Sequence, residues 1–210
     1  MNKTLVTNRL ILKTLNENDP YDFSGIVNLF ENPDTVWWAD LLKPIRLVEQ
    51  AQDFIHWHNH NKEGVFLYGI YAKGEPWLLG TVQVTLFHSL NITVAELGYA
   101  LSYESRGNGF MTEAVHAICD MLFQEPGMVE IRCHILSNNY SSLRVATYCG
   151  FEYVDEPWYE KMLRNRNDYY LDEYVLKRYE YERLKEGGYA LYEIHWKIDR
   201  EEDLYEQLAA

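Results

Sequence analysis

Residues 97–122, which read LGYALSYESRGNGFMTEAVHAICDML, constrain the fold more than any other stretch of this chain. They begin with an alternating apolar run that is typical of a strand, and two closely spaced glycines, Gly107 and Gly109, follow it. After Gly109 the apolar residues recur at spacings of three and four, which predicts one buried helical face: Met111, Ala114, Val115, Ile118, Met121 and Leu122. The stretch therefore predicts a strand, a glycine turn and a helix in direct succession.

The glycine turn admits two interpretations. Gly107 and Gly109 lack a Cβ, so the backbone there can take a positive φ and a ligand can approach it closely. The first N–H groups of the following helix have no internal partner, and together with the helix dipole they favour a phosphate. Arg106 adds a positive charge. Arg-Gly-X-Gly also fits a plain turn, so the motif alone does not choose between a turn and an anion site.

The turn does not match the dinucleotide-binding fingerprint G-x-G-x-x-G. Thr112 occupies the position of the third glycine, and no acidic ribose-binding residue is evident after a second parallel strand. A nicotinamide-binding fold is therefore not expected.

The composition is that of a soluble protein with an acidic surface. The chain has 210 residues, of which 47% are apolar and 24% charged, and this length suits one well-filled core. The formal charge of −13 argues against nucleic acid as a partner and would attract a cationic substrate, although acidity also simply aids solubility. The three cysteines have no framework spacing, and no signal peptide or membrane span is recognisable. We therefore expect a cytoplasmic protein with reduced thiols and no membrane partner.

Strands and helices alternate along the rest of the chain. Helices are expected at 21–30, at 46–59, from 110 onward and from about 140, and strands at 5–15, 65–72, 78–87, 92–102, 129–136, 168–179 and after Gly150. Helices follow two of the central strands, which predicts an α/β fold with a mixed central sheet and helices on both faces. We expect a single domain at residues 1–178 and a C-terminal extension at 179–210, whose role the sequence leaves open.

Four blocks of the chain, in the right order, resemble the GNAT N-acetyltransferase superfamily, especially its ribosomal-protein alanine N-acetyltransferase branch. They are LVTNRLILKTL near the start, AELGYAL, RGNGFMTEAV and NYSSLRVATYCGFE, and together they span about residues 5–178. The joint spacing is far more specific than any single block. The resemblance therefore favours the anion-site interpretation of the glycine turn and a single-domain GNAT acyltransferase fold.

The resemblance implies acetyl coenzyme A as the acetyl donor. Its pyrophosphate would lie on the backbone amides of Arg106, Gly107, Asn108, Gly109, Phe110 and Met111. Its pantetheine arm would pair with the backbone at Ala100, Leu101 and Ser102 and contact Asn139, which is also a good N-cap for the next helix. The chain departs from the family pattern at Glu104, where Gln or Arg is usual, and this weakens the positive charge near the loop.

Acetyl transfer needs a neutral amine, a polarised thioester carbonyl and a proton for the departing thiolate. Glu96 is the candidate base, and a backbone N–H near Tyr99 is a candidate donor to the oxyanion. Ser142 matches the serine that the branch is proposed to use as proton donor to the thiolate, and a capping-turn hydroxyl is the alternative. For Glu96 the alternative is a solvated or salt-bridged strand residue. Many GNAT enzymes carry a tyrosine seven residues after the asparagine, and here that position is Ala146.

The acceptor stays open at this stage. A protein N-terminal α-amine is favoured by the resemblance to the ribosomal-protein branch, and also because its pKa near ~8 makes it easier to deprotonate than a lysine-type amine near ~10.4. A small cationic amine such as a polyamine or an aminoglycoside is the alternative, and so is a regulatory module that binds acetyl coenzyme A without catalysis. Trp37 and Trp38 either shape the acceptor cleft or pack the core. The protein is expected to be a monomer or a homodimer.

The histidine-rich stretch HWHNH is not expected to hold a metal. Only His56 and His60 would share a face of a helix, and no flanking carboxylate completes a catalytic zinc motif. A solvated helix end is the simpler interpretation.

Overall fold

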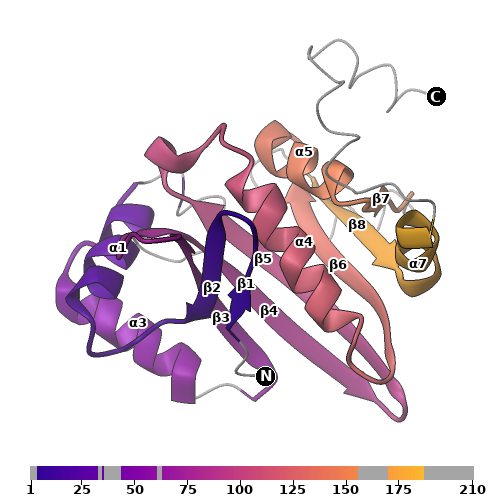
Figure 1. The fold of residues 1–210 in the computed structure, drawn as a ribbon, viewed down its shortest axis with the longest axis horizontal. Coiled ribbons are helices and arrows are strands. Elements are labelled where there is room, and N and C mark those ends of the chain that lie inside the picture. The colour runs from indigo at the N-terminus through magenta and orange to yellow at the C-terminus, as the bar shows by residue number, and fades with distance from the viewer. Residues whose placement is uncertain (1–3, 33–34, 36–43, 61–62, 156–169, 187–210) are drawn as a thin grey trace.

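The computed structural model describes residues 4–32, 35, 44–60, 63–155 and 170–186, and within them a mixed sheet of eight strands forms the centre (Figure 1). The strand order is β1-β2-β3-β4-β5-β6-β8-β7. The strands are β1 (Leu5–Val6), β2 (Leu10–Thr14), β3 (Val65–Ala72), β4 (Leu78–Ser89), β5 (Ile92–Leu101), β6 (Met128–Leu136), β7 (Glu152–Tyr153) and β8 (Leu171–Lys177). Neighbouring strands are antiparallel except for β5 and β6, which run parallel and are connected through a helix.

Helices cover both faces of this sheet, as the sequence predicted. They are α1 (Pro20–Phe30), α3 (Val48–His60), α4 (Phe110–Leu122), α5 (Tyr140–Tyr148) and α7 (Arg178–Glu186), with a short 3₁₀ turn, η1 (Tyr103–Ser105). Buried residues of α4 and α5 pack with Tyr68 and Ile70 of β3, whereas those of α1 and α3 pack with Leu67 of the same strand. Because successive strand residues point to opposite faces, the two helix pairs lie on opposite sides of the sheet, as Figure 1 also shows.

The helix after the glycine turn buries the face that its spacing predicts. Met111, Ala114, Val115, Ile118, Met121 and Leu122 are all buried in the larger core cluster. This packing fixes the direction of α4, so the first turn of the helix points its N–H groups toward the end of β5.

The N-terminal strand predicted at 5–15 is instead a short hairpin of β1 and β2, which pair antiparallel with Leu5 opposite Leu12. Thr7 makes the turn, because its hydroxyl accepts a hydrogen bond from the N–H of Leu10 at 2.9 Å and its N–H donates to the carbonyl of Leu10 at 3.0 Å. Side-chain hydrogen bonding of this kind offers the backbone an alternative to a continuous strand.

The last strand is shorter than predicted, because the chain enters α7 at Arg178. The Arg178 guanidinium donates to the carbonyls of Met128 at 2.6 Å, Phe123 at 2.8 Å and Glu125 at 3.2 Å. Tyr181 is buried and stacks on Phe123. The described part of the predicted extension thus packs against the end of α4 and the start of β6.

Among the helices of the described residues, none is both long enough and apolar enough to cross a bilayer.

Candidate active site

The candidate site lies where β5 and β6 separate. The two strands pair only from Thr93 to Glu96 on β5 and from Met128 to Arg132 on β6. Beyond that point β5 continues to Leu101 with β4 as its partner, and β6 continues to Leu136 with β8 as its partner. The β6-facing N–H and C=O groups of residues 97–101 therefore have no strand partner within the described chain. Buried or half-buried backbone groups in that condition are suited to pair with an extended ligand.

The opening between the strands is bridged on one face of the sheet by Tyr99. Its hydroxyl donates to the backbone carbonyl of Ser142 at 2.9 Å, across from β5 to the first turn of α5. Burial raises the pKa of this hydroxyl far above its ordinary value, so it stays protonated and keeps donating. The contact holds the start of α5 beside the opening.

Asn139 and Ser142 both lie at the start of α5. The Asn139 side chain caps the helix, since its Oδ1 accepts a hydrogen bond from the N–H of Ser142 at 3.2 Å. The capping half of the sequence interpretation is thus confirmed, and the Asn139 amide nitrogen has no acceptor in the described chain. Ala146 is buried on the inner side of α5, where the family tyrosine is missing.

The glycine turn takes the conformation that its sequence predicts. Gly107 has a φ of +77° and Gly109, the N-cap of α4, a φ of +71°, both in the left-handed region that favours glycine. A Cβ built on Gly107 would meet no heavy atom within 4 Å, so the space in front of this residue is open. Another residue at this position would therefore be disfavoured by backbone strain at positive φ and not by a clash with neighbouring atoms.

Three carbonyls of this loop are already paired, whereas its N–H groups from Gly107 onward are not. Arg9 Nη1 donates to the carbonyl of Asn108 at 2.9 Å, and the Asn108 side-chain amide donates to the carbonyls of Ser105 at 3.2 Å and Arg106 at 3.1 Å. Within the described chain, the N–H groups from Gly107 to Thr112 have no acceptor. The loop consequently presents donors on its open side, which is the arrangement that binds a phosphate.

Arg106 stands at the edge of the loop with an exposed side chain. Its Nε donates to the carbonyl of Leu101 at 3.2 Å, which places the guanidinium at the end of β5. Glu104, in η1, is also exposed. Because Arg106 Nε already donates to the Leu101 carbonyl, a ligand strand would have to share this oxygen or use the other backbone groups.

Glu96 is the last β5 residue that pairs with β6. It points away from α4, because its neighbours Ala95 and Leu97 belong to the core cluster under that helix. Its side chain is 42% exposed, and its Oε1 lies 3.5 Å from Nδ1 of His134. The candidate base is thus reachable from solvent at the fork of the two strands.

A charged patch surrounds Glu96 on this face, and we define it as Glu96, Glu130, Arg132, His134 and Glu173. Arg132 forms ion pairs with Glu130 and with Glu173, the latter at 3.3 Å. His134 Nε2 lies 3.8 Å from Glu173 Oε1. The patch arises because the register places Glu96 opposite Arg132 and His134 opposite Glu173.

Comparison with known proteins fits this geometry. Residues 9–152 match the family model of the acetyltransferase (GNAT) domain, which is more than half of the chain. The chain belongs to the GNAT acetyltransferase family. The matched residues include the glycine loop, the strands β5 and β6 and the helix α5, whereas β8 and α7 lie beyond them.

One relative among curated proteins is the probable N-acetyltransferase YjcK of Bacillus subtilis, at 31% identity over 90 residues. That match covers 43% of this chain and 50% of YjcK, so the chain spans about half the length of this relative.

Two solved structures show the same fold. The spermidine N-acetyltransferase of Vibrio cholerae, solved with CoA and spermine, has a TM-score of 0.67 and 17% identity, over 84% of this chain and 99% of that one. The ribosomal-protein-S5-alanine acetyltransferase of Vibrio fischeri has a TM-score of 0.65 and 19% identity, over 84% of this chain and 97% of that one.

The structure of this GNAT domain also reveals a support for the loop that sequence reasoning missed. Glu113 of α4 is 2% exposed, and its carboxylate accepts hydrogen bonds from Thr7 Oγ1 at 2.5 Å, Arg9 N–H at 2.8 Å and Arg9 Nε at 2.6 Å. Burial raises the pKa of Glu113, but these hydrogen bonds outweigh it and leave the pKa below its ordinary value. Arg9 thereby connects the N-terminal hairpin to both α4 and the loop.

His134 and Glu173 were also missed as neighbours of Glu96. The alternating polar residues of VEIRCHIL, namely Glu130, Arg132 and His134, were a usable signal, since they predict one polar face on β6. No local signal brings Glu173 to the same face, because β8 comes from a later part of the chain. Trp37 and Trp38 lie outside the described residues.

Proposed function

We propose that the protein transfers an acetyl group from acetyl coenzyme A to a primary amine, with a protein N-terminal α-amine as the favoured acceptor. The observation that carries the proposal is the succession of two unpaired backbone surfaces. The free edge of β5 at residues 97–101 is followed, after the short η1 turn, by the open N–H groups of the glycine loop from Gly107 onward. An extended ligand that ends in a diphosphate fits both surfaces at once.

The donor would lie along this path. Its pyrophosphate would accept hydrogen bonds from the amides of residues 107–111, beside the exposed guanidinium of Arg106. The Arg106 N–H, which the sequence also suggested, already donates to the Tyr103 carbonyl at 3.3 Å.

The donor's pantetheine arm would pair with the free backbone groups of β5 as far as Leu101, and the free amide nitrogen of Asn139 would donate to it from the other side of the opening. Ser102, which the sequence also suggested, has both backbone groups occupied, because its N–H donates to the Leu79 carbonyl at 2.8 Å and its carbonyl accepts from the Ser105 N–H at 3.1 Å. The acetyl thioester would then lie near the fork, where Glu96 is located.

The reaction would proceed by direct attack. The neutral amine nitrogen forms a bond to the thioester carbon, and Glu96 accepts a proton from that nitrogen directly or through water. A backbone N–H near Tyr99 would stabilise the oxyanion. The C–S bond then breaks, and Ser142 would donate a proton to the departing thiolate. Products are the amide and coenzyme A.

The charged patch supports a cationic acceptor. Three carboxylates gather with Arg132 and His134 on the face that Glu96 shares, and Lys177 lies opposite Glu130 in the register; the formal charge of the whole protein is −13. Such a surface raises the local concentration of amines, which are protonated in solution. A polyamine is the second candidate acceptor, because the fold neighbour from Vibrio cholerae was solved with spermine.

An acceptor screen tests the proposal, with release of the coenzyme A thiol as the readout. Peptides with free N-termini, the same peptides with blocked N-termini and an internal lysine, and polyamines are compared at equal concentration. Turnover on the free N-termini supports the proposed acceptor, and turnover on polyamines alone refutes it. Calorimetric binding of acetyl coenzyme A without acetylation of any amine would instead identify a non-catalytic binding module.

A further inference from the structure

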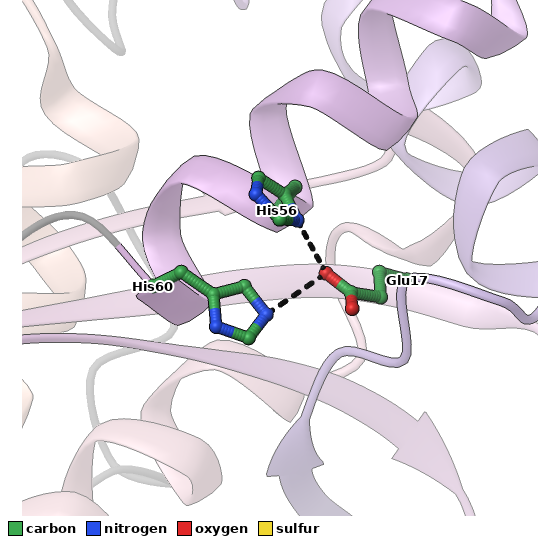
Figure 2. Close-up of side chains that lie close together, drawn as sticks. All are labelled: Glu17, His56 and His60. Atoms are coloured by element: carbon green, nitrogen blue, oxygen red, sulfur yellow. Dashed lines mark hydrogen bonds and ion pairs between the residues drawn. The ribbon is translucent and has the colours of Figure 1, made fainter.

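Two histidines and a remote glutamate meet on the surface formed by α1, α3 and the segment before α1. His56 and His60 lie on the last turns of α3, and Glu17 comes from the segment between β2 and α1 (Figure 2). Figure 2 shows both imidazole rings directed at the same Glu17 carboxylate. This His–Glu cluster (Glu17, His56, His60) supplies the carboxylate that the local sequence of α3 lacks.

The three side chains are already close enough to share an ion. His56 Nδ1 lies 2.9 Å and His60 Nε2 lies 3.1 Å from Glu17 Oε2, and the candidate ligand atoms all lie within 4.8 Å of one another. Ligand atoms of a tetrahedral zinc site are about 3.3 Å apart, as follows from metal–ligand distances near 2.0–2.1 Å. An ion could therefore enter after a small rotation of side chains that are partly exposed.

The histidine between them plays a different part. His58 is buried, and its ring contacts the Phe54 carbonyl through Nδ1 at 2.8 Å and the Gln83 side chain through Nε2 at 3.2 Å. It thus anchors α3 to the sheet while its two neighbours face solvent. Helical spacing explains the division, since residues at i and i+4 share a face and the residue between them does not.

The electrostatics of the cluster suit a cation. The Glu17 carboxylate contributes a negative charge that both imidazoles contact through the same oxygen, Oε2. Within the described chain, Glu17 has no recorded ion pair with a lysine or arginine that would compete with a metal. Two imidazoles and one carboxylate are the ligands that Zn²⁺ and its first-row neighbours prefer, whereas Mg²⁺ and Ca²⁺ prefer sets made of oxygen alone.

We propose that Glu17, His56 and His60 form a binding site for one divalent transition-metal ion, with Zn²⁺ as the representative ion. Three protein ligands leave a fourth position for water. The bound ion connects the β2–α1 segment to the end of α3 and so stabilises the arrangement of the two helices on that face. This site is separate from the proposed acetyl-transfer site and does not depend on it.

Isothermal titration of untagged, metal-free protein with Zn²⁺ tests the proposal. We expect a one-to-one complex, because all three cysteines are buried and unavailable. Glu17→Ala and His60→Ala should each weaken zinc binding at least tenfold, whereas His88→Ala, which removes an exposed histidine on β4, should leave it unchanged.

The visible absorption of bound Co²⁺ distinguishes a specific site from non-specific surface binding. Co²⁺ held by nitrogen and oxygen ligands in tetrahedral geometry absorbs strongly in the visible range, and this absorption should vanish in Glu17→Ala. Thermal unfolding of the same variants without metal checks that they are folded. Equal zinc affinity in the original protein and both variants, or no binding at millimolar zinc, would overturn the proposal.

Discussion

Replacing Gly107 with Val should remove acetyl coenzyme A binding while the fold survives. The φ of +77° costs an L-residue about 1–2 kcal/mol, and no neighbouring atom within 4 Å adds a clash. For a chain of this size that cost corresponds to a fall in melting temperature of roughly 2–8 °C. The domain therefore stays folded at 25 °C.

The effect on the donor should be much larger. The Val side chain would stand in the open space before the loop, where the phosphate must approach the N–H groups. Hydrogen bonds to charged groups contribute about 1.5–3 kcal/mol each. Losing two of them would cost about 3–6 kcal/mol, which corresponds to more than a hundredfold in Kd.

Gly74 provides a matched control. It lies in the turn between β3 and β4 with a φ of +85°, and a Cβ there also meets no atom within 4 Å. Gly74→Val should lower the melting temperature to a similar extent and leave donor affinity unchanged. Calorimetric titration with acetyl coenzyme A measures both variants. If Gly107→Val binds the donor as the original protein does, the loop is a plain turn and the site assignment fails.

Three further variants test other parts of the structure. Glu96→Gln should reduce turnover by roughly 10²–10⁴-fold at pH 6. The loss should be smaller at pH 9, because an α-amine is already neutral there and needs no base. An equal loss of turnover across the pH range would indicate a structural role for Glu96. Glu113→Gln should lower the free energy of unfolding at pH 7 by about 1–3 kcal/mol. Because the folded-state pKa of Glu113 is lowered, its contribution is present above about pH 4.3 and is lost as the pH falls through the folded value. The unfolding free energies of Glu113→Gln and of the original protein should therefore become equal in acid. A difference that stays constant with pH in urea unfolding would show that the ionised carboxylate is not the source of the stabilisation. Arg178→Ala should destabilise by about 2–4 kcal/mol in the same assay, since it frees three carbonyl contacts; a change below ~0.5 kcal/mol would show that α7 is only loosely attached.

The sequence was sufficient for features that a short segment determines by itself. The spacing of apolar residues from Met111 to Leu122 predicted the buried face of α4, and the structure confirms it. The two glycines of the loop predicted backbone with positive φ, because only their lack of a Cβ makes that conformation inexpensive. Helices on both faces of a mixed sheet followed from the alternation of strands and helices.

The tertiary structure decided which distant residues meet. Arg9 and Glu113 are separated by 104 positions, and Glu17 and His60 by 43, and no local pattern pairs them. The fork between β5 and β6 depends on where their pairing ends, and the hairpin at the N-terminus depends on hydrogen bonds around Thr7. Hydrophobic periodicity and backbone preference depend on a few neighbouring residues, so both can be read from the amino-acid sequence. Contacts between remote side chains exist only after the sheet has set the strand order and register, and for that reason the sequence alone did not determine them.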